Sequence, residues 1–207
     1  MRDLFLQYGG FSPEKYLLFS NRLKNLYADM DQKYKDAADY YGFHCSGCKD
    51  NCCLTRFYHH TFSEYFYLSE GYSRLSPEEQ SSVKQKAAQV CEKTAEADKN
   101  GLPVRLMCPL NSDGLCLLYS YRPMICRLHG ISHEFRKPGG DAVYGPGCEE
   151  FERKAAGKSY FRFDRTRFYF EMAGLERELK QSLGIEEKFK MTVAQMLELT
   201  EIWEPGF

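Results

Sequence analysis

Cysteine is the residue type in this chain whose number and spacing point most directly to chemistry. The 207 residues include nine cysteines, and eight of them lie between positions 45 and 148. The first residues form no secretory signal, so we expect a cytoplasmic protein in a reducing compartment, where clustered thiols bind metals rather than form disulfides. The predicted metal ligands are Cys45, Cys48, Cys52, Cys53, Cys108, Cys116, Cys126 and Cys148.

The first four of these cysteines occupy one short segment. Cys45 and Cys48 have the C-x2-C spacing, with which a tight turn brings two sulfurs onto one edge of a metal tetrahedron. Cys52 and Cys53 are adjacent, and adjacent side chains point about 100° apart on a helix and to opposite faces on a strand. We therefore expect either two neighbouring metal centres, or one centre that only one cysteine of this pair binds while the other packs.

The other four cysteines are spread over a segment rich in glycine and proline. Three of them follow a glycine or proline closely, so their sulfurs are expected to be presented from turns. The pairs are Gly114 and Cys116, Pro123 and Cys126, and Gly147 and Cys148. Eight thiolates suffice for two four-thiolate sites, and we expect at least one site to take ligands from both segments, with Cys126 as the crossing ligand.

Several motifs in this region resemble those of a known family. They are Phe43-His-Cys-Ser-Gly-Cys-Lys-Asp-Asn-Cys-Cys53, Cys108-Pro-Leu, Gly114-Leu-Cys116-Leu-Leu-Tyr119 and Tyr121-Arg-Pro-Met-Ile-Cys-Arg127. Together they resemble the CxxCxxCC cysteine-cluster family, also called YkgJ-like proteins, which is described as a zinc- or iron-chelating domain. The resemblance covers about residues 43–150, and the last motif is its most specific part. The chain departs from the pattern in one place, because three residues separate Cys48 from Cys52.

The same cysteine segment is also similar to that of flagellin lysine-N-methylases, which implies an iron–sulfur cluster and an S-adenosylmethionine-dependent activity. This chain is too short to carry the rest of such an enzyme. Two further features favour an iron–sulfur cluster of the 4Fe–4S type: Pro109 follows Cys108, as in bacterial ferredoxins, and aromatic residues crowd the chain after Cys53. Ferredoxin spacing itself is absent, and Zn²⁺ is the alternative.

Two arginines flank Cys126 in the most specific motif. Four thiolates around Zn²⁺ leave a charge of about −2, which nearby guanidinium groups would offset. We therefore expect Arg122 and Arg127 to support the centre and to donate N–H···S hydrogen bonds. Arg162, Arg165 and Arg167 form a small basic cluster that we expect to be solvated.

The remaining cysteine and the histidines are weaker candidates. Cys91 is expected to pack in the core, because it lies beside Val90 on a predicted helix and far in sequence from the other eight. His129 and His44 are alternative ligands, although eight thiolates already suffice. The remaining histidines, His59, His60 and His133, are expected to be solvated or hydrogen-bonded.

Helical periodicity and capping signals predict a mostly α fold, a helical frame around an irregular, loop-rich cysteine core. Helices are expected from Pro13 to about Tyr41, over 62–73 after a capping box of Thr61 and Glu64, over 77–98 after a capping box of Ser76 and Glu79, from about Asp164 to Leu183 before Gly184, and after Thr192. The predicted apolar stripes are Phe19, Leu23, Leu26, Met30, Tyr34, Ala37 and Tyr41 in the first helix, and Phe168, Met172, Leu175, Leu179 and Leu183 in the one that starts near Asp164. The segment 101–148 lacks a hydrophobic period and is predicted to hold one short helix near Pro123. We expect a single domain over 1–207, with an N-terminal helix in 1–42, a metal-binding core in 43–150 and C-terminal helices in 151–207.

Composition restricts the partners. The formal net charge is −1, so no global field attracts nucleic acid, and no apolar run is long enough for a membrane span. The sequence predicts a metal-binding protein whose partners are a metal ion or cluster and, in one alternative, another protein. That alternative is a structural zinc module for protein–protein interaction, and a second one is a methyltransferase-like or redox enzyme that uses the cluster. No catalytic acid–base pair can be singled out.

Overall fold

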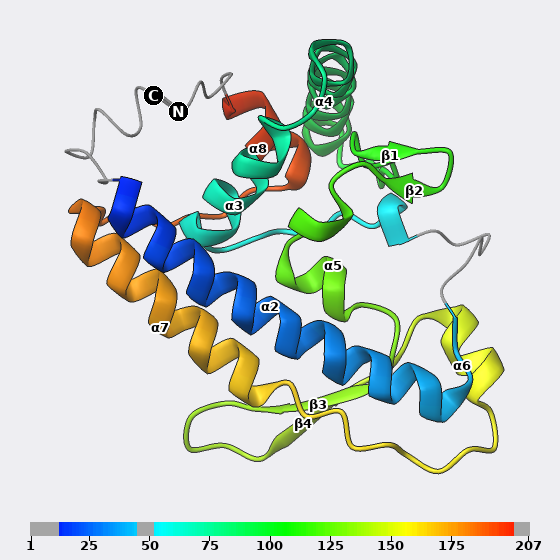
Figure 1. Cartoon of the computed structure of the whole chain (residues 1–207). Helices are drawn as coiled ribbons and strands as arrows, with labels where there is room; N and C mark the ends of the chain where they lie inside the picture. Colours follow the sequence, from blue (N-terminus) through cyan, green and yellow to red (C-terminus); the bar gives the residue numbers. More distant parts are fainter. Residues whose placement is uncertain (1–12, 45–51, 201–207) are drawn as a thin grey trace.

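The computed structural model describes residues 13–44 and 52–200, which form seven α-helices and two small two-stranded antiparallel sheets (Figure 1). The mostly α fold is therefore confirmed. In chain order the elements are α2 (Pro13–Tyr41), the 3-10 helix η1 (Cys52–Leu54), α3 (Phe62–Tyr72), α4 (Pro77–Lys99), β1 (Asn111–Ser112), β2 (Leu115–Cys116), the 3-10 helix η2 (Tyr119–Tyr121), α5 (Met124–Leu128), β3 (His133–Arg136), β4 (Ala142–Gly145), α6 (Glu149–Ala155), α7 (Thr166–Leu183) and α8 (Val193–Leu199).

The two longest predicted stripes, on α2 and α7, form an antiparallel helix pair (Figure 1). Every residue of the stripe predicted for α7 is buried, and α7 ends at Gly184, whose φ of 66° is readily adopted by glycine. Ion pairs between Arg22 and Glu178 and between Arg167 and Asp29 lie along the seam. The pair provides the frame against which the shorter elements pack.

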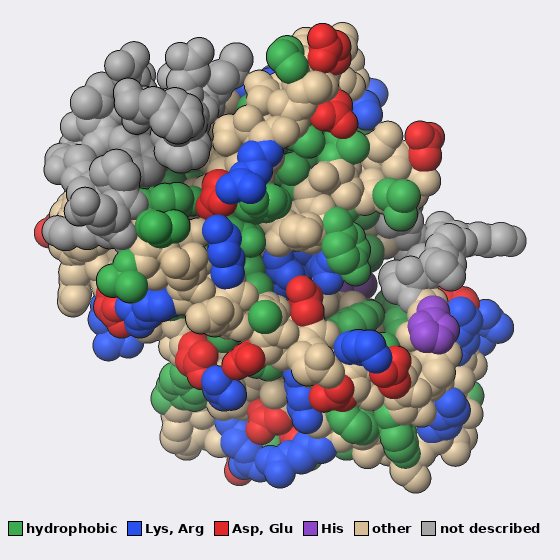
Figure 2. Space-filling model, in the orientation of Figure 1, with side chains coloured by type: hydrophobic (Ala, Val, Ile, Leu, Met, Phe, Trp, Pro, Cys, Tyr) green, Lys and Arg blue, Asp and Glu red, His purple; other side chains and the backbone are tan. Residues whose placement is uncertain are grey.

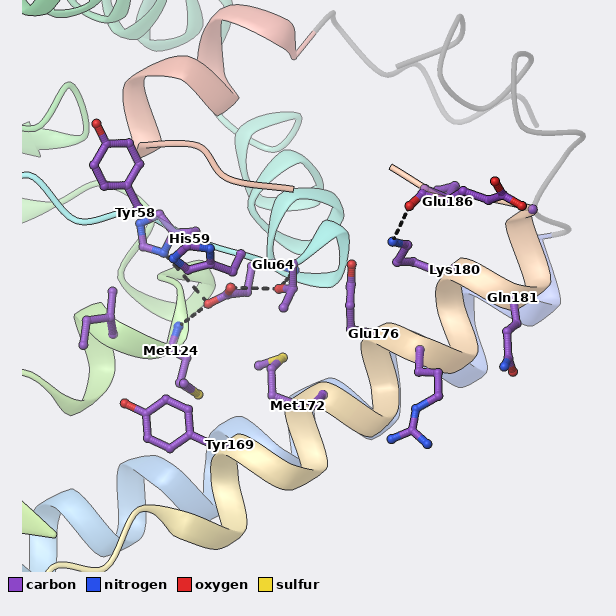
Figure 3. Close-up of a pocket in the computed structure, with 17 residues that line it drawn as sticks. Tyr58, His59, Glu64, Met124, Tyr169, Met172, Glu176, Lys180, Gln181 and Glu186 are labelled. Carbon is purple, nitrogen blue, oxygen red and sulfur yellow. Dashed lines mark hydrogen bonds and ion pairs between the residues drawn. The ribbon is translucent and has the colours of Figure 1, made fainter. Parts of the chain in front are cut away.

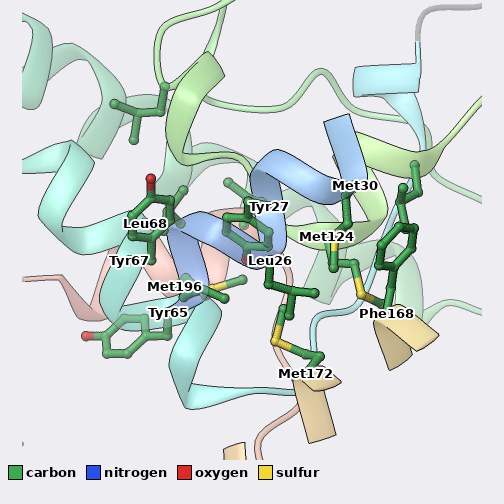
Figure 4. Close-up of a cluster of buried hydrophobic side chains, with 14 of the residues drawn as sticks. Leu26, Tyr27, Met30, Tyr65, Tyr67, Leu68, Met124, Phe168, Met172 and Met196 are labelled. Carbon is green, nitrogen blue, oxygen red and sulfur yellow. The ribbon is translucent and has the colours of Figure 1, made fainter. Parts of the chain in front are cut away.

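A hydrophobic core fills the space between this pair and the shorter helices (Figure 4). Helix α2 contributes Leu26, Tyr27 and Met30, and their partners come from α3, α5, α7 and α8. These partners include Tyr65, Tyr67 and Leu68 of α3, Met124 of α5, Phe168 and Met172 of α7, and Met196 of α8. Helix α5, which carries Cys126, is thus held directly against the core.

Helix α4 projects from this core and packs against α8 (Figure 1). It begins with the predicted capping box, in which Ser76 and Glu79 each bond the backbone of the other, and it ends at Asn100 and Gly101. Val83 and Ala87 are buried, whereas the C-terminal half is largely exposed. Cys91 is half-buried and faces Glu198 on α8, so the expectation that it belongs to the core is wrong.

The segment 101–148 contains the predicted short helix, α5, which starts directly after Pro123. It also contains two hairpins that the periodicity did not indicate. The strands β1 and β2 are joined by Asp113 and Gly114, both with positive φ, as in the tight turn that favours Asp-Gly. The Asp-Gly pair was thus the signal for this hairpin.

The predicted capping box at the start of α3 is only half formed. The Thr61 hydroxyl accepts the N–H of Glu64, as expected. The Glu64 carboxylate, however, accepts the N–H of Met124 at 2.8 Å. This N–H is at the start of α5, where no preceding helical turn supplies an acceptor. The buried carboxylate therefore accepts a hydrogen bond from α5 instead of completing the cap of its own helix.

The expected basic cluster at the start of α7 is divided. Arg165 is 2% exposed, and its guanidinium group donates to the carbonyls of Leu128 and Ile131 after α5. It also lies over the ring of Phe163. The prediction that Arg165 is solvated is therefore wrong, because buried carbonyls at the end of α5 require a donor. Arg162 and Arg167 are exposed, as expected.

Two helical glycines are expected to respond oppositely to alanine. A Cβ added at Gly71 on α3 would lie 2.4 Å from Cγ of Tyr121, whereas one at Gly174 on α7 meets nothing within 4 Å. We expect Gly71→Ala to lower the free energy of unfolding by about 1–3 kcal/mol. Gly174→Ala should raise it by about 0.5–1 kcal/mol through helix propensity.

Urea denaturation of the two glycine variants beside the wild type measures both changes. Equal effects of the two alanines would show that Tyr121 does not pack tightly on α3.

None of the helices in residues 13–44 and 52–200 is long and apolar enough to cross a membrane. On the face that Figure 2 shows, basic and acidic side chains are interspersed.

Candidate metal centre

The two cysteine-containing segments meet at η1. The backbone N–H of Cys108 donates to the carbonyl of Cys53 at 2.8 Å, which joins the end of the first segment to the beginning of the second. Cys45 and Cys48 lie outside the described residues. The structure therefore brings Cys52 and Cys53 of the first segment next to the β1–β2 hairpin (Figure 1).

The second segment presents three cysteines to the same place through local turns. The carbonyl of Cys108 accepts the N–H of Asn111 in a turn, and Asn111 pairs with Cys116 across the hairpin. Cys126 follows on α5, which the core holds in place. A turn, a hairpin and a helix thus place three sulfurs that are far apart in sequence near η1.

Electrostatic interactions couple these thiols to one another. The pKa of Cys108 is raised to about 12, mainly by burial, with smaller contributions from Cys116 and Cys53. Burial also raises the pKa of Cys126, with contributions from Cys108 and Cys116. A thiolate disfavours ionisation of the thiols next to it. Several of these thiols can therefore be ionised together only if a positive charge is nearby.

The side chains of the adjacent residues Cys52 and Cys53 are arranged differently from the prediction that they point apart. The side chain of Cys52 hydrogen-bonds the thiol of Cys53, so the two side chains do not point to separate places. This bond, with one from Asn111, lowers the pKa of Cys53 to about 6. Cys52 therefore lies at the edge of the same thiol cluster, which we define as Cys52, Cys53, Cys108, Cys116 and Cys126.

Cys148 lies elsewhere. It caps α6, and its N–H donates to the carbonyl of Gly130 at 2.9 Å. A Cβ built on Gly130 would lie 3.9 Å from the Cys148 sulfur and 3.7 Å from the ring of Phe43. In Figure 1, α6 is near the C-terminal end of α2, away from η1. Cys148 is thus close to Phe43, two residues before Cys45, rather than to the thiol cluster.

The two flanking arginines supply positive charge to the cluster. Burial raises the pKa of Cys116, and the charges of the two arginines offset a small part of that rise. Both arginines form ion pairs with Asp31 on α2. Arg127 is buried over the ring of Tyr27 and donates to the carbonyls of Arg122 and Ser120. Their hydrogen bonds go to oxygen atoms, so the expected N–H···S bonds to the described cysteines are not formed. The arginines act on the cluster through their charge.

The histidines divide into three groups. His129 packs against the ring of Phe57, and its ring centre is 5.0 Å away. His60 is exposed, and His133 has its Nδ1 3.4 Å from the carbonyl of Ile131, as expected for solvated or hydrogen-bonded residues. His44, the other alternative ligand, is exposed. His59 differs, because it is only 2% exposed and its Nε2 atom has no hydrogen-bond partner among the described residues. The sequence offered no signal for this burial, since His59 lies in an irregular segment.

The thiol cluster has donors that suit a thiophilic metal. Thiolates select zinc and iron–sulfur clusters, and the cluster combines several of them with two guanidinium groups. Within residues 13–44 and 52–200, no three Cys, His, Asp or Glu side chains are close enough to hold a metal ion together. The described residues thus fit the metal in donor type and location, but do not by themselves form a coordination shell.

Comparison with known proteins adds no relative: no family model, curated protein or solved structure matches this chain. The functional assignment therefore rests on the residues themselves.

Proposed function

We propose that this protein binds an iron–sulfur cluster, of the 4Fe–4S type, through thiolates of the thiol cluster. The observation that carries the proposal is the meeting of Cys53 with Cys108, Cys116 and Cys126, fixed by the Cys108 N–H···O=C Cys53 hydrogen bond. Core packing positions the segments that carry these cysteines, and shared coordination would explain why thiols from distant parts of the sequence occupy the same place.

The charges near the cluster support a bound anionic centre. Several thiolates around a metal leave net negative charge, and Arg122 and Arg127 lie close enough to act on Cys116. Arg127 is held in place by Asp31 and by backbone carbonyls. Its position is therefore fixed before any metal binds.

The segment that carries three of the thiols also needs a source of stability. The strands β1 and β2 have two residues each, and a hairpin of that kind is marginal in water. Metal binding free energy becomes folding free energy when the ligands come from distant segments. A metal shared by Cys53 and Cys126 would close a loop of more than fifty residues, which restricts the unfolded chain more than a local clip.

We also propose that the protein is a cytoplasmic member of the CxxCxxCC family. The motifs within residues 43–150 that resemble the CxxCxxCC family include all five cysteines of the thiol cluster, together with Cys45, Cys48, Arg122 and Arg127. Cys45, Cys48 and Cys148 are proposed as further ligands on the sequence pattern alone. Reduced thiols in such number suit the cytoplasm.

Purification under anaerobic conditions tests the metal. We expect brown protein with visible thiolate-to-iron absorption and with both iron and acid-labile sulfide. Colourless protein with stoichiometric zinc would replace the iron–sulfur proposal by a structural zinc module that presents its helices to a protein partner. Protein without any bound metal would contradict both.

A further inference from the structure

A cavity of about 870 Å³ lies between α5, α7 and the chain before α3 (Figure 3). Its size is that of a site for a small organic molecule. Met124, Ile125, Met172 and Ala173 supply apolar lining, and His59 and Glu64 supply polar groups. Arg177, Lys180, Gln181 and Glu186 also line it.

His59 is the unusual residue of this cavity. Its side chain is only 1% exposed, and its Nε2 atom has no hydrogen-bond partner among the described residues. A buried polar atom without a hydrogen-bond partner destabilises the folded state. The backbone of His59 cannot easily move away, because its N–H and carbonyl both pair with Met191, at 2.7 and 3.0 Å. The ring is thus fixed in place with one nitrogen unsatisfied.

Glu64 determines which nitrogen of His59 carries the proton. Its Oε1 accepts the N–H of Met124, and its Oε2 accepts the hydroxyl of Thr61, both at 2.8 Å. Burial raises the pKa of Glu64, but Oε1 accepts the N–H of Met124 and is therefore an acceptor whether or not the other oxygen carries a proton. Oε1 lies 3.9 Å from Nδ1 of His59, so this acceptor favours the proton on Nδ1. Nε2 is then a hydrogen-bond acceptor.

The ring is also neutral at physiological pH. Burial lowers the pKa of His59 to about 4, with a smaller contribution from His60. A neutral ring with its proton on Nδ1 presents a lone pair at Nε2. The group that satisfies it must therefore donate a proton in a hydrogen bond.

The other charged groups of the lining argue against a cationic ligand. Both oxygens of Glu176 accept hydrogen bonds at the start of α3, from the N–H groups of Phe62 and Ser63. Lys180 donates to the carbonyls of Glu186 and Glu187, so its charge has no carboxylate partner there. Arg177 forms no ion pair with any described residue and adds a second positive charge.

We propose that this cavity binds a small, apolar, uncharged or anionic organic molecule that carries one hydroxyl or N–H group, which donates a hydrogen bond to Nε2 of His59. The apolar body lies against Met124, Ile125 and Met172. Ile125 lines the cavity, and the next residue on α5, Cys126, belongs to the thiol cluster. Helix α5 is therefore common to both sites. The binding of the ligand itself does not depend on a bound metal.

The test compares two probes of similar shape, 2-naphthol and 2-methoxynaphthalene, of which only the first has a donor. Fluorescence titration of the full chain should give at least about tenfold tighter binding of 2-naphthol, because one satisfied buried acceptor contributes about that much. The His59→Phe variant keeps an aromatic ring but lacks Nε2. It should lose the preference for 2-naphthol while its affinity for 2-methoxynaphthalene stays the same. Tyr144→Phe, at an exposed residue outside the cavity, is the control and should keep the preference.

A second measurement does not depend on the variant folding. The ¹⁵N chemical shift of His59 Nε2 in the wild type should move when 2-naphthol is added and should stay unchanged with 2-methoxynaphthalene. Equal affinities for the two probes, absence of binding, or an unmoved Nε2 resonance would each overturn the proposal. Repeating the titration after removal of metal by a chelator separates this outcome from the metal proposal, since the preference is expected to survive.

Discussion

Replacement of Cys126 by serine is expected to remove most of the bound metal from this protein. The thiol of Cys126 interacts with Cys53, Cys108 and Cys116, so it is central to the thiol cluster. A serine hydroxyl is a poor ligand for a thiophilic metal. Metal and acid-labile sulfide per chain, measured on anaerobically purified Cys126→Ser, should fall to a small fraction of the wild-type content.

The matched control for this loss is Cys91→Ser. Cys91 lies on α4 near Glu198, outside the thiol cluster, and its replacement should leave the metal content unchanged. Limited proteolysis adds an independent readout: residues 101–148 should be cleaved faster in Cys126→Ser than in Cys91→Ser, because the proposed metal would stabilise that segment. Full metal content in Cys126→Ser, or the same loss in both variants, would contradict the assignment.

Replacement of Arg127 by methionine is expected to destabilise the protein by roughly 2–4 kcal/mol, a large share of the stability of a typical domain. The side chain of Arg127 is 3% exposed. It donates to the carbonyls of Arg122 and Ser120, pairs with Asp31 and stacks on Tyr27. Methionine keeps much of the packing volume but leaves these acceptors without their donor. Urea denaturation measures the change in the free energy of unfolding.

Arg153→Met is the control for this substitution. Arg153 pairs with Glu150 on the surface of α6, and its side chain is 69% exposed. Surface ion pairs contribute little, so the unfolding curve of Arg153→Met should overlay that of the wild type. If Arg127→Met has an equally small effect, the guanidinium group is not what holds α5 to α2.

Interactions within a few residues of one another could be read from the sequence. The start of α4 at Ser76, the stop of α7 at Gly184 and the short helix after Pro123 were all predicted correctly. Each depends on a side chain or a backbone angle acting on its immediate neighbours, and the apolar stripe of α7 depends on helix geometry alone. Such signals can be recognised without knowing which segment packs against the helix.

Interactions between distant segments were not predicted. Glu64 was expected to complete a capping box, and it instead accepts the N–H of Met124, sixty positions away. Arg165 was expected to be solvated, and it is buried against carbonyls after α5. Glu64 could have bonded its own helix, and Arg165 could have stayed in solvent. Each instead bonds a buried backbone group at an end of α5, because leaving such a group unsatisfied costs more free energy than a surface hydrogen bond gains.

The same division holds for the candidate sites. The sequence by itself determined that eight cysteines share the chain from 45 to 148 and that a thiophilic metal is their most natural ligand, because thiolate chemistry is a property of the residue type. Only the tertiary structure decided that Cys53, Cys108, Cys116 and Cys126 gather while Cys148 lies beside Phe43, and that His59 is enclosed with one nitrogen unsatisfied. Proximity and burial depend on how helices pack, and packing is the sum of many weak contacts that no spacing in the sequence records.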